Sequence, residues 1–314
     1  MREYADLRDG VISALGRLTA AGRDILVMVA DSTSTSKIAP FLETYPERVI
    51  NVGIAEQNMV GMAAGLALGG HVVFTANAAP FLVARANEQV KNDVCYSATN
   101  VKMLGLNAGV AYGPLASTHH AIDDISIMSG FGNVQILAPC DEVEVIQMVE
   151  YAAAVEGPVY IRLDNAKFPI VHEADYRFQP GRPDVVMRGS RVVVIALGSV
   201  VGEALDACEW VKAQHNIAPT LVNLSSIRPL DQDALAKIIA AHDCVVTVEE
   251  HSLHGGIGAI TAVLMARRQL AKPLTMLGIT EGEFAKYGTR KGIRRHYRID
   301  AAGIAEAICA QCAH

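Results

Sequence analysis

The stretch RVINVGIAEQNMVGMAAGLALGG, residues 48–70, decides the fold. It opens with a short β-type run, turns at Gly53 and continues as a helix rich in Ala, Gly and Met, with Glu56 on its first turn. A carboxylate is favoured there because the free N–H groups and the dipole of a helix N-terminus stabilise negative charge. Since His71 is the only ionisable residue from 57 to 83, we expect a helix buried on all sides and Glu56 at the edge of a covered space.

Strand-like and helix-like patterns alternate along the whole chain, which indicates parallel sheets covered by helices. The run 25–30 is continuously apolar, as expected for a strand covered on both faces. Further strand-like runs occupy residues 49–52, 72–75, 101–106, 134–138, 191–197, 219–223, 244–249 and 274–278. Between 164 and 190 the pattern becomes irregular and contains several prolines, which marks a linker. We therefore expect an α/β protein with two doubly wound domains. Residues 1–172 form a mainly parallel sheet, 173–189 the linker, and 190–314 a smaller domain with a mixed sheet.

Composition favours a cytoplasmic α/β enzyme. The 314 residues are 51% apolar and 19% charged, and the formal charge of −6 argues against nucleic-acid binding. The charged N-terminus does not resemble a signal peptide, and Gly69 and Pro80 interrupt the uncharged stretch, so we expect no membrane span. The six cysteines have irregular spacings typical of reduced thiols. Cys309, Cys312 and His314 have redox or metal spacing, but one pair without further ligands is weak evidence, and we predict no metal site.

Residues 53–67, GIAEQNMVGMAAGLA, resemble the signature of the pyrimidine-binding domain of transketolases. The resemblance implies thiamine diphosphate as cofactor, and implies that Glu56 hydrogen-bonds a ring nitrogen of its aminopyrimidine. A buried carboxylate stabilises the protonated ring, so the exocyclic amine shifts toward its imino form and the cofactor becomes its own general base. The motifs SIRPLD (226–231) and VTVEEHSLHGGIG (246–258) are similar to the transketolase C-terminal domain.

The resemblance also assigns Asp31, Phe81 and His119. Asp31 follows an apolar run and matches an aspartate that approaches the cofactor, although the tract after it also reads as a solvated turn. Phe81, located by counting back from Arg85, matches an aromatic that stacks on the aminopyrimidine, although phenylalanine is equally ordinary in a core. His119 opens the segment HHAIDD, expected to begin a helix, and matches a histidine over the reacting carbon. Paired histidines at a helix start are otherwise caps or surface residues.

Candidate substrate-binding residues show matches and departures. Arg8 and Thr35 match residues that bind the sugar phosphate. Asn107 stands where a phosphate-contacting histidine is usual, and the strand GPVYIRLDN (157–165) ends in Asp164 where an arginine is common. Leu115 replaces an aspartate that reads a donor hydroxyl. Because charge-assisted contacts are the strong ones, we expect the transketolase machinery to act on an atypical sugar.

The resemblance covers only the second half of a complete transketolase. No Gly-Asp-Gly motif, which normally holds the divalent metal and the diphosphate, is present. The resemblance therefore implies the carboxy-terminal subunit of a split transketolase, which depends on an N-terminal subunit that holds Mg²⁺ or another divalent ion. Self-association of two such pairs would give a symmetric heterotetramer.

The activity implied is transfer of a two-carbon ketol unit from a ketose, or ketose phosphate, to an aldose acceptor. Glu56 and His119 would be the catalytic residues. Three alternatives remain: the β subunit of a 2-oxo acid dehydrogenase decarboxylating component, half of a deoxyxylulose phosphate synthase, and a non-catalytic regulatory subunit. The residues EQN after the helix start, Thr118-His119 and SIRPLD favour transketolase.

Overall fold

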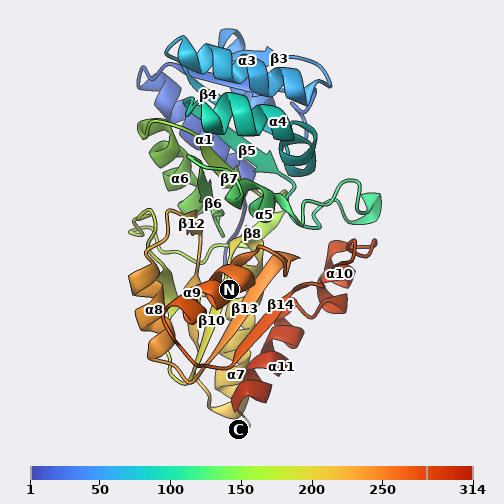
Figure 1. Cartoon of the computed structure of the whole chain (residues 1–314). Coiled ribbons are helices and arrows are strands. Elements are labelled where there is room, and N and C mark those ends of the chain that lie inside the picture. Colours follow the sequence, from blue (N-terminus) through green and yellow to red (C-terminus); the bar gives the residue numbers. More distant parts are fainter. Residues whose placement is uncertain (1, 281, 313–314) are drawn as a thin grey trace.

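Seven strands form the larger sheet of the computed structural model, which describes residues 2–280 and 282–312 (Figure 1). Their order is β12-β6-β7-β5-β4-β2-β3, and all neighbours are parallel except β12 with β6. The strands are β2 (Ile25–Val29), β3 (Val49–Asn51), β4 (Val72–Ala78), β5 (Val101–Leu106), β6 (Gln135–Leu137), β7 (Val159–Arg162) and β12 (Ser226–Arg228). The mainly parallel sheet expected from the apolar runs is confirmed.

Helices cover both faces of this sheet, which is why its strands are apolar on both sides. On one face, Phe74 and Leu104 pack into a core with α1 (Leu7–Ala20), α2 (Ala39–Thr44) and α6 (Glu142–Ala154). On the other, Val73 and Met103 pack with α3 (Glu56–Leu68), α5 (Asp124–Ser129) and the π-helical segments η2 (Pro80–Arg85) and η3 (Val90–Tyr96). The short helices are η1 (Pro46–Arg48), α4 (Asn87–Gln89), η4 (Gly113–Leu115) and η5 (Gly198–Val200).

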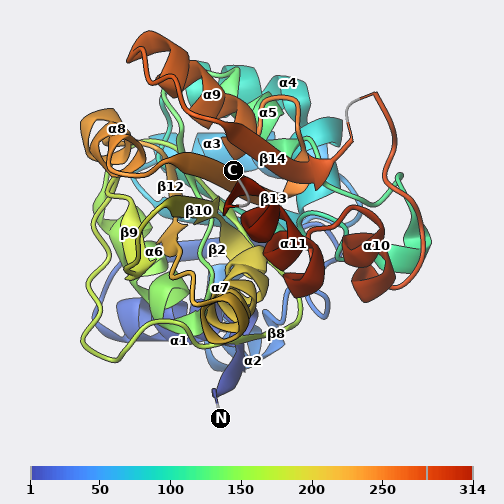
Figure 2. The ribbon, with the colours of Figure 1, turned by 90° about the horizontal axis from the view of Figure 1, so that it is seen from below.

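The second sheet has five strands in the order β14-β13-β10-β11-β9, with β9 antiparallel to β11. The strands are β9 (Asp184–Met187), β10 (Val192–Ala196), β11 (Thr220–Asn223), β13 (Cys244–Ser252) and β14 (Leu274–Ile279). Figure 2 shows α7 (Val201–His215) and α11 (Ala301–Cys312) on one face, and α8 (Gln232–Ala240) and α9 (Ile257–Arg267) on the other. α10 (Arg290–His296) lies outside these layers. This smaller mixed sheet confirms the expected fold class.

The two domains share a core and a strand. One apolar cluster runs from α3 and β5 of the first domain to α8 and α9 of the second. The strand β12 belongs to the second half of the chain but extends the first sheet, with Ser226 opposite Leu137. A two-stranded ribbon of β1 (Tyr4–Asp6) and β8 (Lys167–Pro169) precedes the connection. The segment 173–189, expected to be an irregular linker, contributes β9 to the second sheet, because its short apolar run is long enough for an edge strand.

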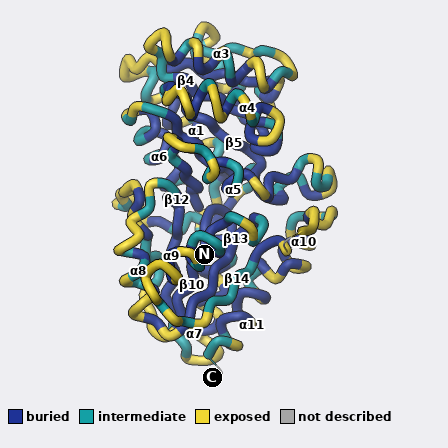
Figure 3. The backbone as a smooth tube through the Cα atoms, viewed as in Figure 1, coloured by how far each residue is buried: buried dark blue, intermediate teal, exposed yellow. Residues whose placement is uncertain are grey.

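Two local expectations need correction. The helix α3 is not buried on all sides: Met59 and Ala63 face the core, but Met62 and Leu68 are exposed, with Leu68 at 76% (Figure 3). An apolar helix sequence does not reveal that no other element of the chain packs against one of its faces. The second correction concerns the segment 119–124, which is not helical until Asp124, since Ala121 pairs with Gly109 across the base of a loop.

Within the described part of the chain, no helix combines the length and the apolar character needed to cross a lipid bilayer. Cys309 and Cys312 lie half-buried on α11 as free thiols, and His314 lies outside the described residues.

Candidate active site

The candidate residues lie at one edge of the first sheet. Asp31 follows β2, Glu56 follows β3, Phe81 follows β4, Asn107 follows β5 and Asp164 follows β7. These strands are parallel neighbours, so their carboxyl ends meet at the same edge. That edge is where open α/β sheets bind ligands.

Glu56 is the buried acid of this edge. It is the first residue of α3 and only 3% exposed. Its Oε2 accepts a hydrogen bond of 2.8 Å from Nη1 of Arg85. The guanidinium of Arg85 also lies 4.5 Å from the ring centroid of Phe81, which precedes it by one turn in η2. Because the Arg85 side chain is 47% exposed, its guanidinium can move away from Glu56 and remain solvated by water.

Aromatic contacts continue from Phe81 to the loop after β5. The rings of Phe81 and His119 meet edge to face with centroids 5.2 Å apart, and the rings of Tyr112 and His119 do the same with centroids 5.3 Å apart. The Tyr112 hydroxyl accepts a hydrogen bond of 2.7 Å from Nδ2 of Asn107. Burial raises the pKa of Tyr112, so its phenol stays neutral. Glu56, Phe81, His119 and Asn107 therefore form one contiguous group, joined by Arg85 and Tyr112, which the sequence reasoning did not assign to the site.

Of the two adjacent histidines, His119 faces the site. His119 is half-buried, and its Nδ1 lies 2.9 Å from the hydroxyl of Thr118. His120 is buried with its Nε2 3.1 Å from the carbonyl oxygen of Gly113. Burial lowers the pKa of His120, which makes it a neutral donor to that carbonyl.

Left-handed backbone shapes two of the strand ends. Asp31 has φ of 54° and Asn107 has φ of 56°, a region in which Asp and Asn are enriched among non-glycine residues. The Asp31 N–H donates to Oδ1 of Asn51 at 3.0 Å, and the same oxygen accepts from the Gly53 N–H. The loop of Asp31 is therefore tied to the turn that leads into Glu56.

Arg8 and Thr35 are brought together, but the guanidinium is heavily engaged. Arg8 donates 2.9 Å hydrogen bonds to the carbonyl oxygens of Thr35 and Asn165. It also pairs with both carboxylate oxygens of Asp6, and this pair raises the pKa of Arg8. The Thr35 hydroxyl donates to the carbonyl oxygen of Ser32 at 3.1 Å. Arg8 thus connects the loop after β2 to the turn after β7.

Asp164 is occupied by an arginine of the second domain. Its Oδ1 accepts from Nη1 of Arg290 at 2.5 Å, and its Oδ2 pairs with Nη2 of the same guanidinium. Burial favours the neutral acid, yet Arg290 lowers the pKa of Asp164 to about 2. The carboxylate is ionised and engaged with Arg290 rather than free to meet a ligand.

Of the functional residues that the sequence did not reveal, Arg85 had a signal in the sequence and Arg290 did not. Arg85 follows Phe81 by four residues, which places the two on one helical face. Arg290 had none, because 126 residues separate it from Asp164 and the contact depends on domain packing.

The chemistry of the group is that of a binding site for a flat nitrogen heterocycle. A buried carboxylate suits a ring nitrogen that carries a proton, and a half-buried aromatic ring such as that of Phe81 suits stacking. The imidazole of His119, which contacts the rings of both Phe81 and Tyr112, is a group that can donate or accept a proton.

Comparison with known proteins places both domains. Residues 3–169 match the family model "Transketolase, pyrimidine binding domain", and residues 181–304 match "Transketolase, C-terminal domain". The chain therefore has the domain pair of a pyrimidine-binding half followed by a C-terminal half. It belongs to the transketolase family, which confirms the resemblance seen in residues 53–67.

Similar proteins are subunits of split enzymes. A subunit of the apulose-4-phosphate transketolase of Actinobacillus succinogenes is 52% identical over 285 residues, covering 91% of each chain. The corresponding subunit from Phocaeicola vulgatus is 35% identical, covering 95% of this chain and 94% of its own. A solved structure described as a split gene transketolase, inactive beta4 tetramer, is 33% identical, with a TM-score of 0.89 and 98% of each chain covered. These relatives support a split transketolase.

Proposed function

We propose that this chain is the pyrimidine-binding subunit of a split, thiamine-diphosphate-dependent transketolase. The observation that carries the proposal is the contact of Glu56, through Arg85 and Phe81, with His119, which joins three segments distant in sequence. The donor set fits an aminopyrimidine, because a buried carboxylate lies beside an aromatic ring at the ligand-binding edge of the sheet. When bound, thiamine diphosphate would supply the carbanion that accepts and releases the two-carbon unit.

The residues of this chain would bind, orient and move protons. Glu56, released from Arg85, would hold a proton shared with the pyrimidine ring nitrogen, and Phe81 would orient the ring by stacking. His119 contacts the rings of both Phe81 and Tyr112, and its imidazole would exchange a proton with a sugar oxygen. Asp31 would approach the cofactor from the neighbouring loop. An N-terminal subunit would hold the diphosphate and Mg²⁺ or another divalent ion.

For the substrate, we propose a ketose phosphate of the kind named in the relatives, apulose-4-phosphate, as the donor. The 52% identity over 91% of both chains supports this choice. Asn107 donates to Tyr112, and Leu115 stands where the resemblance leads one to expect an aspartate, so this side of the site offers fewer charged contacts than a typical transketolase. Arg8 and Thr35 remain the candidates for the phosphate, with Arg8 already oriented by Asp6.

The first experiment is calorimetric titration of thiamine diphosphate with Mg²⁺ into this chain alone and into its mixture with the proposed N-terminal subunit. Binding in the mixture alone is the expected result. The mixture is then assayed with apulose-4-phosphate and with ordinary pentose phosphates. Turnover of the pentose phosphates at a comparable rate would contradict the proposed specificity, and absence of binding in the mixture would contradict the cofactor assignment.

A pair of variants tests the role of Glu56. Glu56→Gln keeps the shape of the side chain but removes the charge, and we expect kcat to fall about 100-fold to 10,000-fold. Glu47→Gln is the matched control, since Glu47 is exposed and its side chain lies in η1 just before β3. Full activity of the Glu56→Gln complex would leave the chain as a non-catalytic subunit.

The exposed face of α3 supports self-association. Ile54, just before α3, and Met62 and Leu68 within α3 are all exposed, and α3 lies at the outer end of the first domain (Figure 3). We propose that another subunit covers this face in the assembled enzyme. Leu68→Glu should shift the sedimentation coefficient toward the monomer, whereas Val263→Glu, an exposed apolar position of α9, should not. Equal effects of the two changes would contradict this interface.

A further inference from the structure

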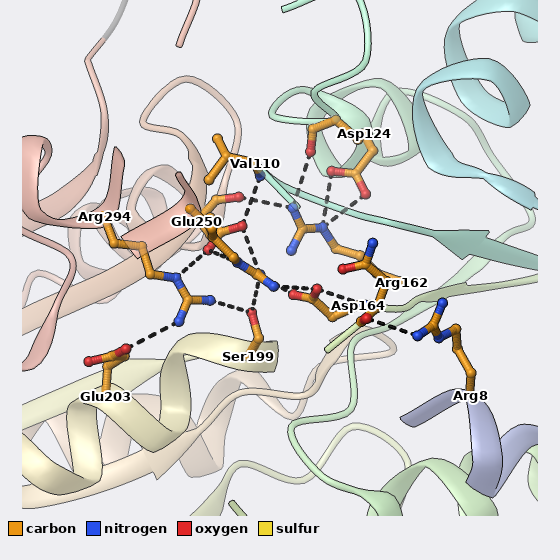
Figure 4. A network of polar contacts seen from close by, with 12 residues as sticks. Arg8, Val110, Asp124, Arg162, Asp164, Ser199, Glu203, Glu250 and Arg294 are labelled. Carbon is orange, nitrogen blue, oxygen red and sulfur yellow. Dashed lines mark hydrogen bonds and ion pairs between the residues drawn. The ribbon is translucent and has the colours of Figure 1, made fainter. Parts of the chain in front are cut away.

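A carboxylate of the second domain binds the loop that carries His119. Glu250 lies on β13 and is 2% exposed. Its Oε1 accepts a 2.8 Å hydrogen bond from the N–H of Val110 and a 2.9 Å bond from Nη2 of Arg290. Its Oε2 accepts from Nε of Arg290 at 3.1 Å and from Nε of Arg294 at 2.5 Å (Figure 4). We refer to Asp164, Glu250, Arg290 and Arg294 as the Glu250 cluster.

The bond to Val110 lies at the base of the loop. Gly109 and Ala121 pair with each other through hydrogen bonds of 3.0 and 2.9 Å, so residues 110–120 form a closed excursion between them. The backbone passes directly over Glu250, since a Cβ on Gly109, whose φ is +64°, would lie 2.4 Å from Oε1. Neither the loop base nor the Glu250 carboxylate can shift without disturbing the other.

Further contacts from the second domain support the tip of the loop. The Ser117 hydroxyl donates to the carbonyl oxygen of Ala285 at 3.1 Å. Gly113 packs so closely on the segment before α10 that a Cβ there would lie 2.6 Å from the carbonyl oxygen of Gly288. The loop thus rests on the second domain at its base, its middle and its tip, while its other side presents Tyr112 and His119 to Phe81.

Arg290 extends the same support to a second part of the site. Its guanidinium holds Asp164 in a two-point contact. The next residue, Asn165, accepts through its carbonyl oxygen from Arg8, which in turn donates to Thr35. From Arg290, an unbroken series of bonds therefore reaches the loop after β2, where the candidate phosphate ligands lie.

We propose that Glu250 and Arg290 are positioning residues of the active site, through which the C-terminal domain fixes the His119 loop and the Arg8–Thr35 loop against the sheet. Neither side chain contacts Glu56, Phe81 or His119, so both act through the loops that they hold. The proposal rests on the proposed function for its catalytic consequence, but its structural part stands on the contacts of this chain alone.

A control must break the domain junction without touching these loops. Such a junction exists at what we call the His172 cluster, formed by Asp141, Glu144, His172 and Asp184, in which Nε2 of His172 lies 3.0 Å from Oδ2 of Asp184. Asp184→Asn removes one charge from this cluster, as Glu250→Gln does from the other. Arg290→Lys keeps the charge but loses the two-point geometry, and it serves where Glu250→Gln does not fold.

The test is hydrogen exchange by mass spectrometry on the whole chain, with no partner or cofactor. We expect Glu250→Gln and Arg290→Lys to raise the exchange rate of the 107–121 peptides about tenfold, whereas Asp184→Asn leaves them within twofold. Loop exchange that is unchanged in both test variants, or raised equally in Asp184→Asn, would overturn the proposal. Hydrogen exchange does not depend on turnover, so this test can contradict the positioning role without contradicting the proposed function, and the reverse.

The catalytic consequence is measured on the complex with the N-terminal subunit. Glu250→Gln should lower kcat/KM for the sugar about 10-fold to 100-fold, because small misplacement of catalytic groups is costly. The affinity for thiamine diphosphate should change less than twofold, and Arg290→Lys should retain more activity than Arg290→Met. Equal loss of cofactor affinity and turnover would indicate general loss of structure and contradict a positioning role.

Discussion

The two charged clusters that join the domains differ in what they hold. The His172 cluster lies between the start of α6, the segment after β8 and the edge strand β9. Its Glu144 also accepts hydrogen bonds from Asn223 on β11 and from Ser225, but these partners carry none of the candidate site residues. The Glu250 cluster has a similar mix of buried charges but also binds the backbone of a loop that carries candidate catalytic residues. The role of a buried charge cluster between domains therefore depends on which segments of chain it holds, rather than on its charges.

The clusters also differ in the sign of the charge at their centre. In the His172 cluster, an imidazole lies between two carboxylates, with Nδ1 2.9 Å from Asp141 and Nε2 3.0 Å from Asp184. Although burial opposes the charged form, these bonds raise the pKa of His172 to about 10. Both ring nitrogens then carry protons and donate to carboxylates. Cys140, Asp141 and His172 offer ligand atoms at a spacing that could hold a metal ion, but in this structure both ring nitrogens of His172 lie against carboxylate oxygens.

The largest effect on stability is expected at Asp141. This buried carboxylate caps α6 through the N–H of Glu144 and accepts from the N–H groups of Val171 and His172 as well as from the imidazole. Asp141→Ala should lower the free energy of unfolding by about 3 to 5 kcal/mol, because it leaves a buried cation and several donors without partners. Urea unfolding at pH 7 measures the change.

Activity separates Asp141 from the Glu250 cluster. In complex with the N-terminal subunit, the fraction of Asp141→Ala that remains folded should keep the proposed activity within about twofold of wild type, because Asp141 contacts none of the candidate site residues. A loss of kcat/KM as large as that of Glu250→Gln would show that both clusters reach the site, and the contrast between them would fail.

The next effect is a fall in stability at high pH. A histidine whose pKa is raised in the folded state contributes stability that is complete below its ordinary pKa and lost as the pH rises through the folded value. For His172 this window runs from about pH 6.5 to about pH 10. We expect His172→Gln to cost about 2 to 4 kcal/mol more at pH 6 than at pH 10.5, measured by urea unfolding at both values. An equal cost at both would mean that the imidazole is neutral.

The contribution of the Glu250 cluster to stability should be lost at low pH rather than at high pH. The pKa of Asp164 is lowered to about 2 against burial by Arg290, so its contribution is present above about pH 4 and is lost as the pH falls through about 2. Asp164→Asn should therefore cost about 2 kcal/mol at pH 7 and less at pH 3. Urea unfolding of both proteins at the two pH values gives the difference, and a cost that grows toward acid would contradict the assignment.

The sequence predicted those strands well that are buried on both faces, because such strands consist almost entirely of apolar residues. The runs that became β2 and β10 are continuously apolar because helices cover both sides. The edge strands β9 and β12 leave a weaker signal, since they are only four and three residues long and include polar or charged residues. The exposed side of α3 was missed for a related reason, as composition does not distinguish a face buried in the core from one left for another subunit.

The candidate site was predictable to the extent that it follows from strand order. Parallel strands place Asp31, Glu56, Phe81 and Asn107 at one edge whatever the details of packing. The polar contacts of Asp164 and Arg8 were not predictable, because they depend on how the domains dock and on backbone carbonyls that any residue could provide. The family resemblance suggested a role for each candidate residue, whereas the ion-pair and hydrogen-bond partners of the charged residues are known only from the structure.

The smallest effect is expected for a long-range ion pair that lacks burial. Nη2 of Arg17 lies 2.8 Å from Oε1 of Glu150 and joins α1 to α6 across 133 residues, yet the two side chains are 54% and 42% exposed. Glu150→Ala should change the free energy of unfolding by less than about 0.5 kcal/mol, because water solvates both charges before and after the change. Urea unfolding at low and at high salt measures it, and any difference should vanish at high salt. A loss comparable to that of Asp141→Ala would mean that sequence separation, rather than burial and backbone contacts, governs how strongly a charge pair holds this fold together.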